Sequence, residues 1–337
     1  MRKLARIEKV ETIEAIVGAD AIEAVTVGGW RVVVRKGEFA VGDHGVYFEI
    51  DSLLPEGDPR FAAFCARGVR DMLRDDGTTV RGHVLRTVKL RGVVSQGLLM
   101  PVAALGLSEL PLGTDVAAQL GVVKFEPPLP ANGNGDQVGP FPTHIASKTD
   151  AERVQNLGEA FATLHAHPAG WVATEKVDGT SLTVARAEDG TFSVASRNWL
   201  IAEGANLYWD AARPLLDQLS PGMAVQAEIF GEGVQGNPLK VRGRRVAVFN
   251  LVRNREAIPR AQWPAWALAL AVPELNVTLP ASVADAVAQA DGIMSAVSPG
   301  QLAEGIVWQA RDGAALPQLD GRHQFKVISN RWLLKHG

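Results

Sequence analysis

The stretch from Ala173 to Ser181, Ala-Thr-Glu-Lys-Val-Asp-Gly-Thr-Ser, places a lysine two positions before an aspartate, with a glycine next. The residues up to Lys176 predict a strand, and Asp178-Gly179 predicts a tight turn at its end. Glycine here allows a backbone conformation closed to other residues and a close approach by a ligand. Lys176 is thus placed to act as a nucleophile beside a carboxylate. Taken alone, however, Lys-Val-Asp-Gly is more typical of an exposed hairpin turn than of an active site.

Other charged residues of the second half of the chain lie inside or at the ends of apolar strand-like runs. A buried charge is costly unless it is paired, so one such residue is explained by a salt bridge. Several charges of both signs indicate a shared polar cleft, because perturbed titratable groups gather at functional sites. These residues are Glu175, Lys176, Asp178, Glu228, Glu304 and Lys326.

A nucleophilic Lys176 must lose its proton, so its pKa must be lowered. A nearby cation has that effect, and Lys326, Arg197 or a bound divalent metal ion is a candidate. Carboxylates act in the opposite direction unless a metal ion neutralises them. A metal, an arginine and a second lysine around a nucleophile suit attack on a nucleotide phosphate.

The same carboxylates provide oxygen donors for a hard cation such as Mg²⁺. That ion keeps most of its waters, so the carboxylates are expected to hold the waters rather than the metal itself. The expected donors are Asp178, Glu228 and Glu304.

Length and composition indicate a globular protein of two domains. The chain has 337 residues, of which 47% are hydrophobic and 21% charged, and no apolar run is long enough to span a membrane. The N-terminal residues lack the apolar core of a signal peptide, and the single cysteine, Cys65, excludes an internal disulfide and a cysteine zinc cluster. We therefore expect a cytoplasmic protein. A net charge of −3 argues against strong non-specific nucleic-acid binding by the whole surface but leaves room for a local basic groove.

The first domain, residues 1–125, consists of short strand-like runs separated by turns, which is typical of a small antiparallel barrel or sandwich. The stretch from Phe61 to Arg74 is expected to be helical or irregular. Trp30, Tyr47 and Phe48 are candidate stacking platforms, although aromatics in a small barrel more often face the core. The expected strands are Trp30–Val34, Val46–Ile50, His83–Leu90 and Ser95–Pro101.

Basic residues cluster in the second half of this domain, at Arg81, Arg86, Lys89 and Arg91. A small barrel with a basic face indicates oligonucleotide binding in the manner of an OB-fold. The charges alone slightly favour the alternative, a solvated strand face with ordinary arginines.

Residues 126–142 are rich in proline, glycine and asparagine and are expected to form a linker or long loop before a second domain at 143–337. Thr149 and Glu152 fit a capping box, and apolar residues at helical spacing predict a helix that ends at Pro168. A three-strand meander from Trp171 to Ser196 follows. Further helices are expected at 204–219, broken near Pro214, from Pro259, and from Ser282 to Gly292; further strands are expected at 224–231, 246–252, 304–308 and 323–328.

Six stretches of this second domain, in order, resemble the motifs of the covalent nucleotidyltransferases, which are the DNA ligases, RNA ligases and mRNA capping enzymes. Six motifs in order are far more specific than any one of them. They are Glu175–Gly179 (motif I), Ser196–Asn198 (Ia), Gln226–Gly231 (III), Ala247–Asn250 (IIIa), Ala303–Val307 (IV) and Gln324–Ser329 (V).

The chain most resembles the ATP-dependent RNA ligases of the Deinococcus type, which carry an OB-like module before the ligase domain. The resemblance implies an α+β fold: a small N-terminal antiparallel β-barrel followed by an ATP-grasp-like nucleotidyltransferase domain of antiparallel sheets with flanking helices. The stretches that resemble this type outside the six motifs are Thr26–Trp30, Val41–Asp43, Val46–Pro55, Lys89–Gly92, Ser95–Gly97 and Phe141–Leu157.

The resemblance also implies roles for single residues at the nucleotide. Lys176 would attack the α-phosphate of ATP and hold AMP through a phosphoramidate, and Lys326 would contact that phosphate. Thr174 and Glu175 would flank the adenine. Phe249 would stack on it, although a core phenylalanine in a central strand is nearly as good an interpretation.

Further roles concern the metal and the RNA. Arg197 would meet the ribose or a phosphate and later the RNA end, and Glu228 the ribose or a metal-bound water. Asp178 and Glu304 would orient the hydration shell of Mg²⁺ or Mn²⁺.

The implied activity is RNA ligation in three steps. The enzyme becomes adenylated on lysine, AMP passes to an RNA 5′-phosphate, and a 3′-hydroxyl displaces AMP to form the phosphodiester. Each step is an in-line displacement at phosphorus, so one set of groups can serve all three. The implied cofactors are ATP and Mg²⁺ or Mn²⁺, and the implied partner is RNA or an RNA-containing duplex, at nicks for example; a monomer without membrane attachment is expected.

Two alternatives stay open: a DNA ligase or capping-type enzyme with the same pocket, and a non-catalytic nucleic-acid binder with a degenerate pocket. The sequence also departs from the family pattern. Many relatives have two lysines in motif V, whereas here Gln324 precedes Lys326 and Ile328 follows it. Nine residues follow Ile328, so the C-terminal OB domain of DNA ligases and capping enzymes is not expected here. A basic run at Lys240, Arg242, Arg244 and Arg245 could meet pyrophosphate or RNA, although a solvated hairpin is the favoured interpretation.

Overall fold

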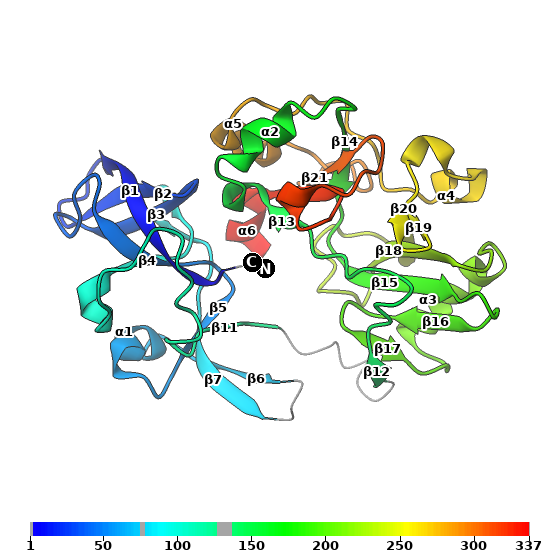
Figure 1. Ribbon diagram of the computed structural model, residues 1–337, viewed down its shortest axis with the longest axis horizontal. Coiled ribbons are helices and arrows are strands. Elements are labelled where there is room, and N and C mark those ends of the chain that lie inside the picture. Colours follow the sequence, from blue (N-terminus) through cyan, green and yellow to red (C-terminus); the bar gives the residue numbers. More distant parts are fainter. Residues whose placement is uncertain (1–2, 75–77, 127–136, 337) are drawn as a thin grey trace. The chain divides into compact units, whose positions relative to one another are not determined.

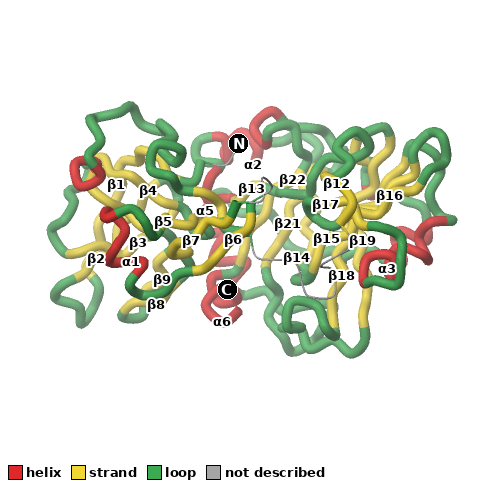
Figure 2. The backbone as a smooth tube through the Cα atoms, turned by 90° about the horizontal axis from the view of Figure 1, so that it is seen from below, coloured by secondary structure: helices red, strands yellow, loops and turns green. Residues whose placement is uncertain are grey.

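The computed structural model describes residues 3–74, 78–126 and 137–336. The chain forms two compact units: the first is residues 1–128 together with Leu333–Lys335, and the second is residues 129–332 together with His336. Both consist mainly of antiparallel strands with short helices (Figure 1, Figure 2). In the described part of the chain, no helix is long and apolar enough to cross a membrane.

The first unit is built around β1 (Ala5–Ala15), a long strand that pairs with β4 along its first half and with β2 along its second. Its register shifts between Val10 and Thr12, where a bulge bends the strand. One sheet has the order β10 (Leu98–Pro101), β4 (His44–Phe48), β1, β2 (Ile22–Val27), β3 (Trp30–Arg35); the other has the order β11 (Val123–Lys124), β5 (Ser52–Pro55), β7 (Thr79–Val84), β6 (Arg70–Leu73). The short helices are η1 (Pro59–Phe61), α1 (Ala62–Cys65) and η2 (Val102–Leu105).

The core interpretation of the aromatic residues in this unit is confirmed. Trp30, Tyr47 and Phe48 are fully buried, and the Tyr47 hydroxyl donates to the carbonyl of Gln96 at 3.2 Å. The stretch expected to be helical or irregular, 61–74, contains α1 but ends in β6. A single strand over 83–90 is wrong, because the chain leaves β7 at Val84 and Leu85 bonds back to Ser52 instead.

Two short strands, β8 (Val88–Leu90) and β9 (Val93–Ser95), form a hairpin whose turn is Arg91-Gly92. Both turn residues have positive φ, 48° and 86°, as a tight two-residue hairpin requires. The base of this hairpin is fixed to β3, because the Ser95 hydroxyl accepts a hydrogen bond from the N–H of Val33 at 2.9 Å. Lys89 and Arg91 are exposed on this β8–β9 hairpin.

The second unit contains two sheets. The larger has seven antiparallel strands in the order β12 (Gln137–Pro140), β17 (Trp199–Ile201), β16 (Phe192–Ala195), β15 (Thr180–Arg186), β18 (Met223–Gly231), β19 (Arg244–Arg253), β20 (Glu256–Ala257). The smaller has the order β13 (Glu152–Arg153), β22 (Gln324–Ile328), β21 (Gly305–Ala310), β14 (Trp171–Lys176), and in it β13 runs parallel to β22. The expected linker lies mostly on residues 127–136, outside the described residues, whereas 137–140 form β12.

Helices cover one face of each sheet in the second unit. Helix α3 (Leu207–Leu216) packs on apolar residues of β15, β18 and β19, including Leu182, Val225 and Val248. Helices α2 (Ala160–His165) and α5 (Val283–Asp291) lie together against the smaller sheet (Figure 1), with Phe161 beside Phe325 of β22. The remaining helices are η4 (Val154–Asn156), η5 (Arg260–Gln262), α4 (Ala265–Ala269), η6 (Pro317–Leu319) and the C-terminal α6 (Asn330–His336).

The segment 270–275 joins the two sheets of this unit. It bonds to β19 on one side, with Val272 N–H donating to the carbonyl of Val248 at 2.8 Å, and to β14 on the other, with Glu175 N–H donating to the carbonyl of Pro273 at 2.9 Å. The side-chain amide of Gln309 adds a second link, donating to the carbonyl of Phe249 at 2.7 Å. The strands that carry the motifs are therefore held to one another by backbone hydrogen bonds.

The helix predicted from Thr149 onward is wrong in its first half. Residues 152–153 pair with β22, η4 follows, and only 160–165 are α-helical. Gly158 has φ of +48°, which interrupts any continuous helix. The apolar residues at helical spacing are nevertheless buried, because the irregular segment turns them toward the same core.

Two expectations about prolines are also wrong. Helix α3 is not broken at Pro214 but contains it. The helix expected from Pro259 is instead the single turn η5, followed by the short α4 after Pro264. The helix from Ser282 is confirmed, since the Ser282 hydroxyl accepts from the N–H of Asp285 at 3.1 Å.

Candidate active site

Lys176 ends β14 and lies opposite Gly305, the first residue of β21. This register brings its ammonium to Glu304, the residue before β21, with 2.7 Å between Nζ and Oε2. Gly305 lets β21 begin close to β22, because a Cβ there would lie 2.1 Å from the carbonyl oxygen of Val327 on β22. The lysine side chain stays 25% exposed and the glutamate 11%, so the pair is reachable from solvent.

Asp178-Gly179 does not form a hairpin turn. It carries the chain from β14 in the smaller sheet to β15 in the larger one. Gly179 lacks a positive φ, so the expectation of a special backbone conformation is wrong. The need for glycine is steric: a Cβ would lie 2.2 Å from the carbonyl oxygen of Ile229 on β18. The crossing strands can thereby pass close together, and Asp178 comes near Glu228.

Three carboxylates surround the lysine and shift one another's titration. Burial raises the pKa of Glu228 to about 8; Lys176 opposes this, and Glu304 and Asp178 add to it. Burial likewise raises the pKa of Asp178 to about 7, with Glu304 adding to the effect and Lys176 opposing it. Burial acts to lower the pKa of Lys176, but Glu304, Glu228 and Asp178 outweigh it, so the net shift is upward. The lysine therefore keeps its proton until positive charge enters this cluster.

A second cationic group lies across the smaller sheet. Lys326 of β22 is paired with Val307 of β21, which is paired with Thr174 of β14, so the three lie in one row across the strands. Burial, with Arg153 and Lys176 nearby, lowers the pKa of Lys326 to about 7. A phosphate bound here would favour the charged form of this lysine.

Arg153 is a neighbour that the sequence did not reveal. It lies on β13 directly beside Lys326, and it is buried. In the sequence it lies inside the predicted helix, and that pattern does not indicate pairing with a strand over 170 residues later. The single lysine of motif V indicates that one cation is missing from the pattern, but it does not indicate where the replacement lies.

Arg197, just after β16, forms a short ion pair with Asp150. The segment that carries Asp150 is tied down on either side: Lys148 donates to the side chain of Asn198 at 3.1 Å, and Gln226 donates to the carbonyl of Ser147 at 2.8 Å. Arg197 also acts electrostatically on Glu228 and on Lys326. It therefore belongs to the same charged cluster as the lysine.

Phe249 lies at an irregularity of β19. Gln226 pairs with Asn250 and Ala227 pairs with Val248, so Phe249 is the extra residue of a β-bulge. It is half-buried and packs against the apolar cluster that contains Val177, the residue next to Lys176. It does not belong to the core under α3, which weakens the interpretation of it as an ordinary core residue.

Glu175 lies apart from the other sequence-predicted residues. Neighbouring side chains of a strand point to opposite faces, and the carboxylate of Glu175 is bonded to Ser295, Ala296 and Val297. Thr174, on the same side as Lys176, is buried and donates to the carbonyl of Val307 at 3.3 Å.

Among residues 3–74, 78–126 and 137–336, no three His, Cys, Asp or Glu side chains are arranged to hold a metal ion directly. Asp178, Glu228 and Glu304 nevertheless all lie close enough to the Lys176 ammonium to raise its pKa. The pKa values of Asp178 and Glu228 are themselves raised to about 7 and about 8, so these two carboxylates take up protons near neutral pH when no cation is present. Such a donor set fits a hydrated divalent ion, whose waters carboxylates can hold.

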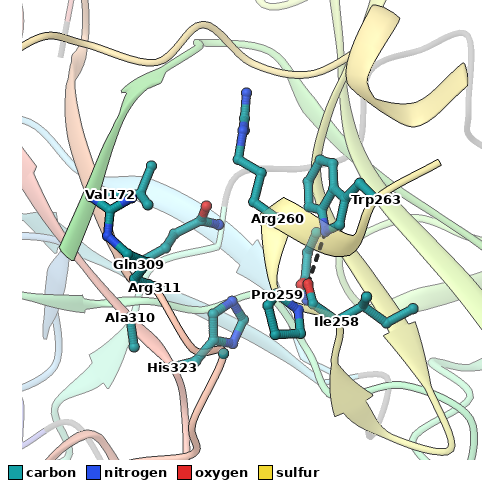
Figure 3. Close-up of a pocket in the computed structure, with 11 residues that line it drawn as sticks. Val172, Ile258, Pro259, Arg260, Trp263, Gln309, Ala310, Arg311 and His323 are labelled. Carbon is teal, nitrogen blue, oxygen red and sulfur yellow. Dashed lines mark hydrogen bonds between the residues drawn. The ribbon is translucent and has the colours of Figure 1, made fainter. Parts of the chain in front are cut away.

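A small cavity lies farther along the same strands (Figure 3). Its water-accessible volume is about 20 Å³, which suits roughly one water molecule. Burial lowers the pKa of His323, on its wall, to about 4, so this imidazole is neutral. Val172, four residues before Lys176, also lines the cavity, which is therefore distinct from the charged cluster.

The fold and site define a class: an OB-type module joined to a ligase-type nucleotidyltransferase domain with a lysine at its centre. Comparisons with known proteins agree. A family model described as an OB-fold domain matches residues 4–102, and one described as RNA ligase matches residues 169–328. No protein in a direct search of curated proteins matches the sequence.

Solved structures of an RNA ligase from Naegleria gruberi are similar over the whole chain. A mutant with ATP and Mn is 37% identical, with 99% of each chain covered and a TM-score of 0.84. The enzyme with pyrophosphate is 36% identical, with coverage of 100% of this chain and 99% of that one and a TM-score of 0.83. A mutant with AMP and Mn is also 36% identical, with 99% of each chain covered and a TM-score of 0.83. This chain belongs to the RNA ligase family, which confirms the resemblance read from its motifs.

Proposed function

We propose that this protein is an ATP-dependent RNA ligase that joins RNA 3′-hydroxyl and 5′-phosphate ends through a covalent lysyl-AMP. The observation that carries the proposal is the position of Lys176, held 2.7 Å from Glu304 and flanked by two further carboxylates and by Lys326. The similar Naegleria gruberi enzyme has been solved with ATP, AMP and Mn. Two of its solved variants replace a lysine and an aspartate two positions later, the spacing of Lys176 and Asp178.

In the first step, the deprotonated Lys176 nitrogen attacks the α-phosphorus of ATP and pyrophosphate leaves. Lys326 and Arg153, adjacent on β22 and β13, place positive charge where negative charge builds up on the phosphate. A divalent ion held through water by Asp178, Glu228 and Glu304 would supply the charge that lowers the pKa of Lys176. Thr174 and Phe249 border the adenine in this scheme.

In the second step, an RNA 5′-phosphate oxygen attacks the same phosphorus, and Lys176 is released as AMP moves to the RNA end. In the third, a 3′-hydroxyl attacks the RNA 5′-phosphorus and AMP leaves. Arg197, which is paired with Asp150, is positioned to exchange that carboxylate for a phosphate of the RNA. All three displacements use one set of cations.

We further propose that the substrate is a nicked duplex, that the protein acts as a cytoplasmic monomer, and that the N-terminal module grips the nucleic acid. The proposed division is 1–125 for this module and 143–337 for the adenylyltransferase domain, with the linker within 126–142. Incubation with ATP and nicked duplexes that differ only in the sugar of the 3′-hydroxyl strand tests the activity. Sealing of RNA-ended nicks is expected; sealing of DNA-only nicks at equal rate would indicate a DNA ligase, and labelling by GTP instead of ATP a capping-type enzyme.

Arg153 is expected to take over the role of the missing second lysine of motif V. Changing it to alanine should lower the single-turnover rate of lysine adenylation on the order of 10²-fold, the typical effect of losing one donor to a developing charge. Lysine at this position should recover part of the rate. Arg311→Ala, which removes an exposed arginine just after β21, is the control. An unchanged rate in Arg153→Ala would show that Lys326 acts without it.

The β8–β9 hairpin is expected to bind RNA. From residue 78 to residue 108 the chain has no acidic residue. Arg81 is paired with Glu56 and Asp71, whereas Arg86, Lys89 and Arg91 are exposed and pair with no carboxylate of the described residues. Charge of this kind attracts the phosphate backbone.

Replacing these three residues with alanine should leave lysine adenylation unchanged and raise the KM for nicked RNA, with a reduced salt dependence of binding equivalent to about three phosphate contacts. Arg31→Ala is a matched control, because Arg31 is exposed in the same unit but paired with Glu14 at 2.6 Å. Gel-shift titrations at several salt concentrations measure the slope. A triple variant with wild-type affinity would assign RNA binding to another surface.

A further inference from the structure

Glu175 is a buried carboxylate that the chemistry described above does not use. It is 1% exposed and accepts three hydrogen bonds: from the Ser295 hydroxyl at 2.5 Å, the Ala296 N–H at 2.7 Å and the Val297 N–H at 3.2 Å. Burial raises its pKa, and these three donors oppose that shift. A carboxylate accepts about four hydrogen bonds, so most of the capacity of Glu175 is used within the protein, and its burial keeps it away from a ligand.

Its three donors belong to one loop, residues 293–304, which leads from α5 into β21. The loop is folded on itself: the Ser295 N–H donates to the carbonyl of Gln301 at 2.9 Å, and the Ala303 N–H donates to the carbonyl of Ile293 at 3.1 Å. Its last residue is Glu304, the partner of Lys176. Glu175 and Lys176 are adjacent on β14, so the same two segments are joined twice, once on each side of the strand.

The loop is also tied to the segment that follows β18. The Ser295 hydroxyl accepts from the N–H of Ser298 at 3.0 Å, and the Ser298 hydroxyl donates to the carbonyl of Leu239 at 2.6 Å. Val297 packs in the same apolar cluster as Val177 and Leu239. The three segments that carry the carboxylates around Lys176 therefore converge on the loop that Glu175 holds.

We propose that Glu175 is a positioning residue: its carboxylate fixes the 293–304 loop against β14 and so sets the placement of Glu304 relative to the Lys176 nitrogen, without contacting the nucleotide. This inference rests on the proposed adenylation of Lys176. It replaces the expectation that the Glu175 side chain flanks the adenine. The physical basis is that a displacement of about 1 Å at a reacting group can cost on the order of 10² in rate.

Glu175→Gln tests this role with little change in size. A glutamine can keep the two backbone bonds only with its amide oxygen in the place of Oε2, and its NH₂ group then faces the Ser295 hydroxyl, which can no longer donate to residue 175. The negative charge that strengthens these bonds is also lost. The kcat of lysine adenylation is expected to fall about 10- to 100-fold, with the KM for ATP and the preference for ATP over GTP unchanged. Glu274→Gln is the matched control: it removes a more exposed carboxylate from the segment beside β14 and should have no effect.

Ser295→Ala removes one donor from the other side of the contact and leaves the carboxylate intact. Its kcat is expected to fall about 3- to 10-fold, and the effect of the double variant should be smaller than the product of the two single effects. This variant decides the matter if Glu175→Gln fails to fold. A raised KM for ATP or a lost preference over GTP in Glu175→Gln would make Glu175 a nucleotide ligand, and wild-type kcat in Ser295→Ala would also overturn the proposal.

The wild-type protein separates this proposal from the one on which it rests. If it gains no AMP when incubated with ATP and metal, the proposed ligase activity is wrong. If it gains AMP and both variants do so at the wild-type rate, the ligase activity stands and the positioning role of Glu175 is wrong.

Discussion

A Lys176→Met variant is expected to lose its ATP-dependent gain in mass of one AMP, with a fall in adenylation rate on the order of 10⁴-fold or more, as for other removed nucleophiles. The methionine side chain is unbranched, like that of lysine, and is apolar enough for this partly buried position, so the fold should persist. Intact-mass measurement after incubation with ATP and Mg²⁺ or Mn²⁺ reads the covalent adduct directly.

The same variant separates adenylation from the final joining step. Because Lys176 is the nucleophile only in adenylation, Lys176→Met should still join an RNA whose 5′ end already carries AMP. Lys335→Met, which removes an exposed lysine in α6, should keep both activities. An adduct that persists in Lys176→Met would place the nucleophile elsewhere, and a wild type without any adduct would favour a non-catalytic nucleic-acid binder.

The central residues of the site could be predicted because local pattern was sufficient for them. Lys176, Glu304 and Lys326 each interrupt or flank a short apolar strand, and the strands concerned, β14, β21 and β22, are neighbours in one sheet. A charge in such a strand is retained only where it has a partner or a use. Motifs that are far apart in the sequence therefore bring their charged residues together in the folded chain.

Arg153 could not be predicted in this way. Its position depends on parallel pairing between β13 and β22, and such a contact between distant segments leaves no periodic signal in either of them. The apolar residues that follow it fit a helical spacing, and the burial they predict is real. What the spacing did not reveal is that a positive φ at Gly158 divides the segment.

Glu175, Gly179 and Phe249 show a second limit of the sequence. Their positions in the motifs were evident, but each acts through backbone geometry: a loop that supplies two N–H donors, a strand crossing that excludes a Cβ, and a bulge that redirects a ring. Backbone hydrogen bonds and steric exclusion depend on which segments meet. They become visible only when the sheets are assembled.

Glu304→Gln is expected to change the adenylation rate through two opposing effects. Glu304 accepts a hydrogen bond from Lys176 and raises the pKa of that lysine. The neutral amide should therefore lower this pKa, which increases the fraction of the nucleophilic form at a given pH. The same substitution removes a charged oxygen donor from the waters of the metal and weakens the stabilisation of charge at the α-phosphate.

The magnitudes decide the outcome. Each unit by which a pKa falls raises the deprotonated fraction at most tenfold, whereas loss of one preorganised charged group costs on the order of 10²- to 10³-fold. The maximal rate should fall, while the acidic limb of the pH–rate profile, where Lys176 is still protonated, should move to lower pH. Half-saturation by Mn²⁺ should require a higher concentration.

Single-turnover adenylation at saturating ATP, measured from pH 5 to pH 9 and over a range of Mn²⁺ concentrations, tests these expectations together. Glu203→Gln, which neutralises an exposed glutamate paired with Arg213 at 3.6 Å, should leave the profile unchanged. A Glu304→Gln variant faster than the wild type at pH 7, with unchanged metal dependence, would mean that Glu304 serves only to keep Lys176 protonated. In that case the charge that activates the nucleophile must be held by Asp178 and Glu228 alone.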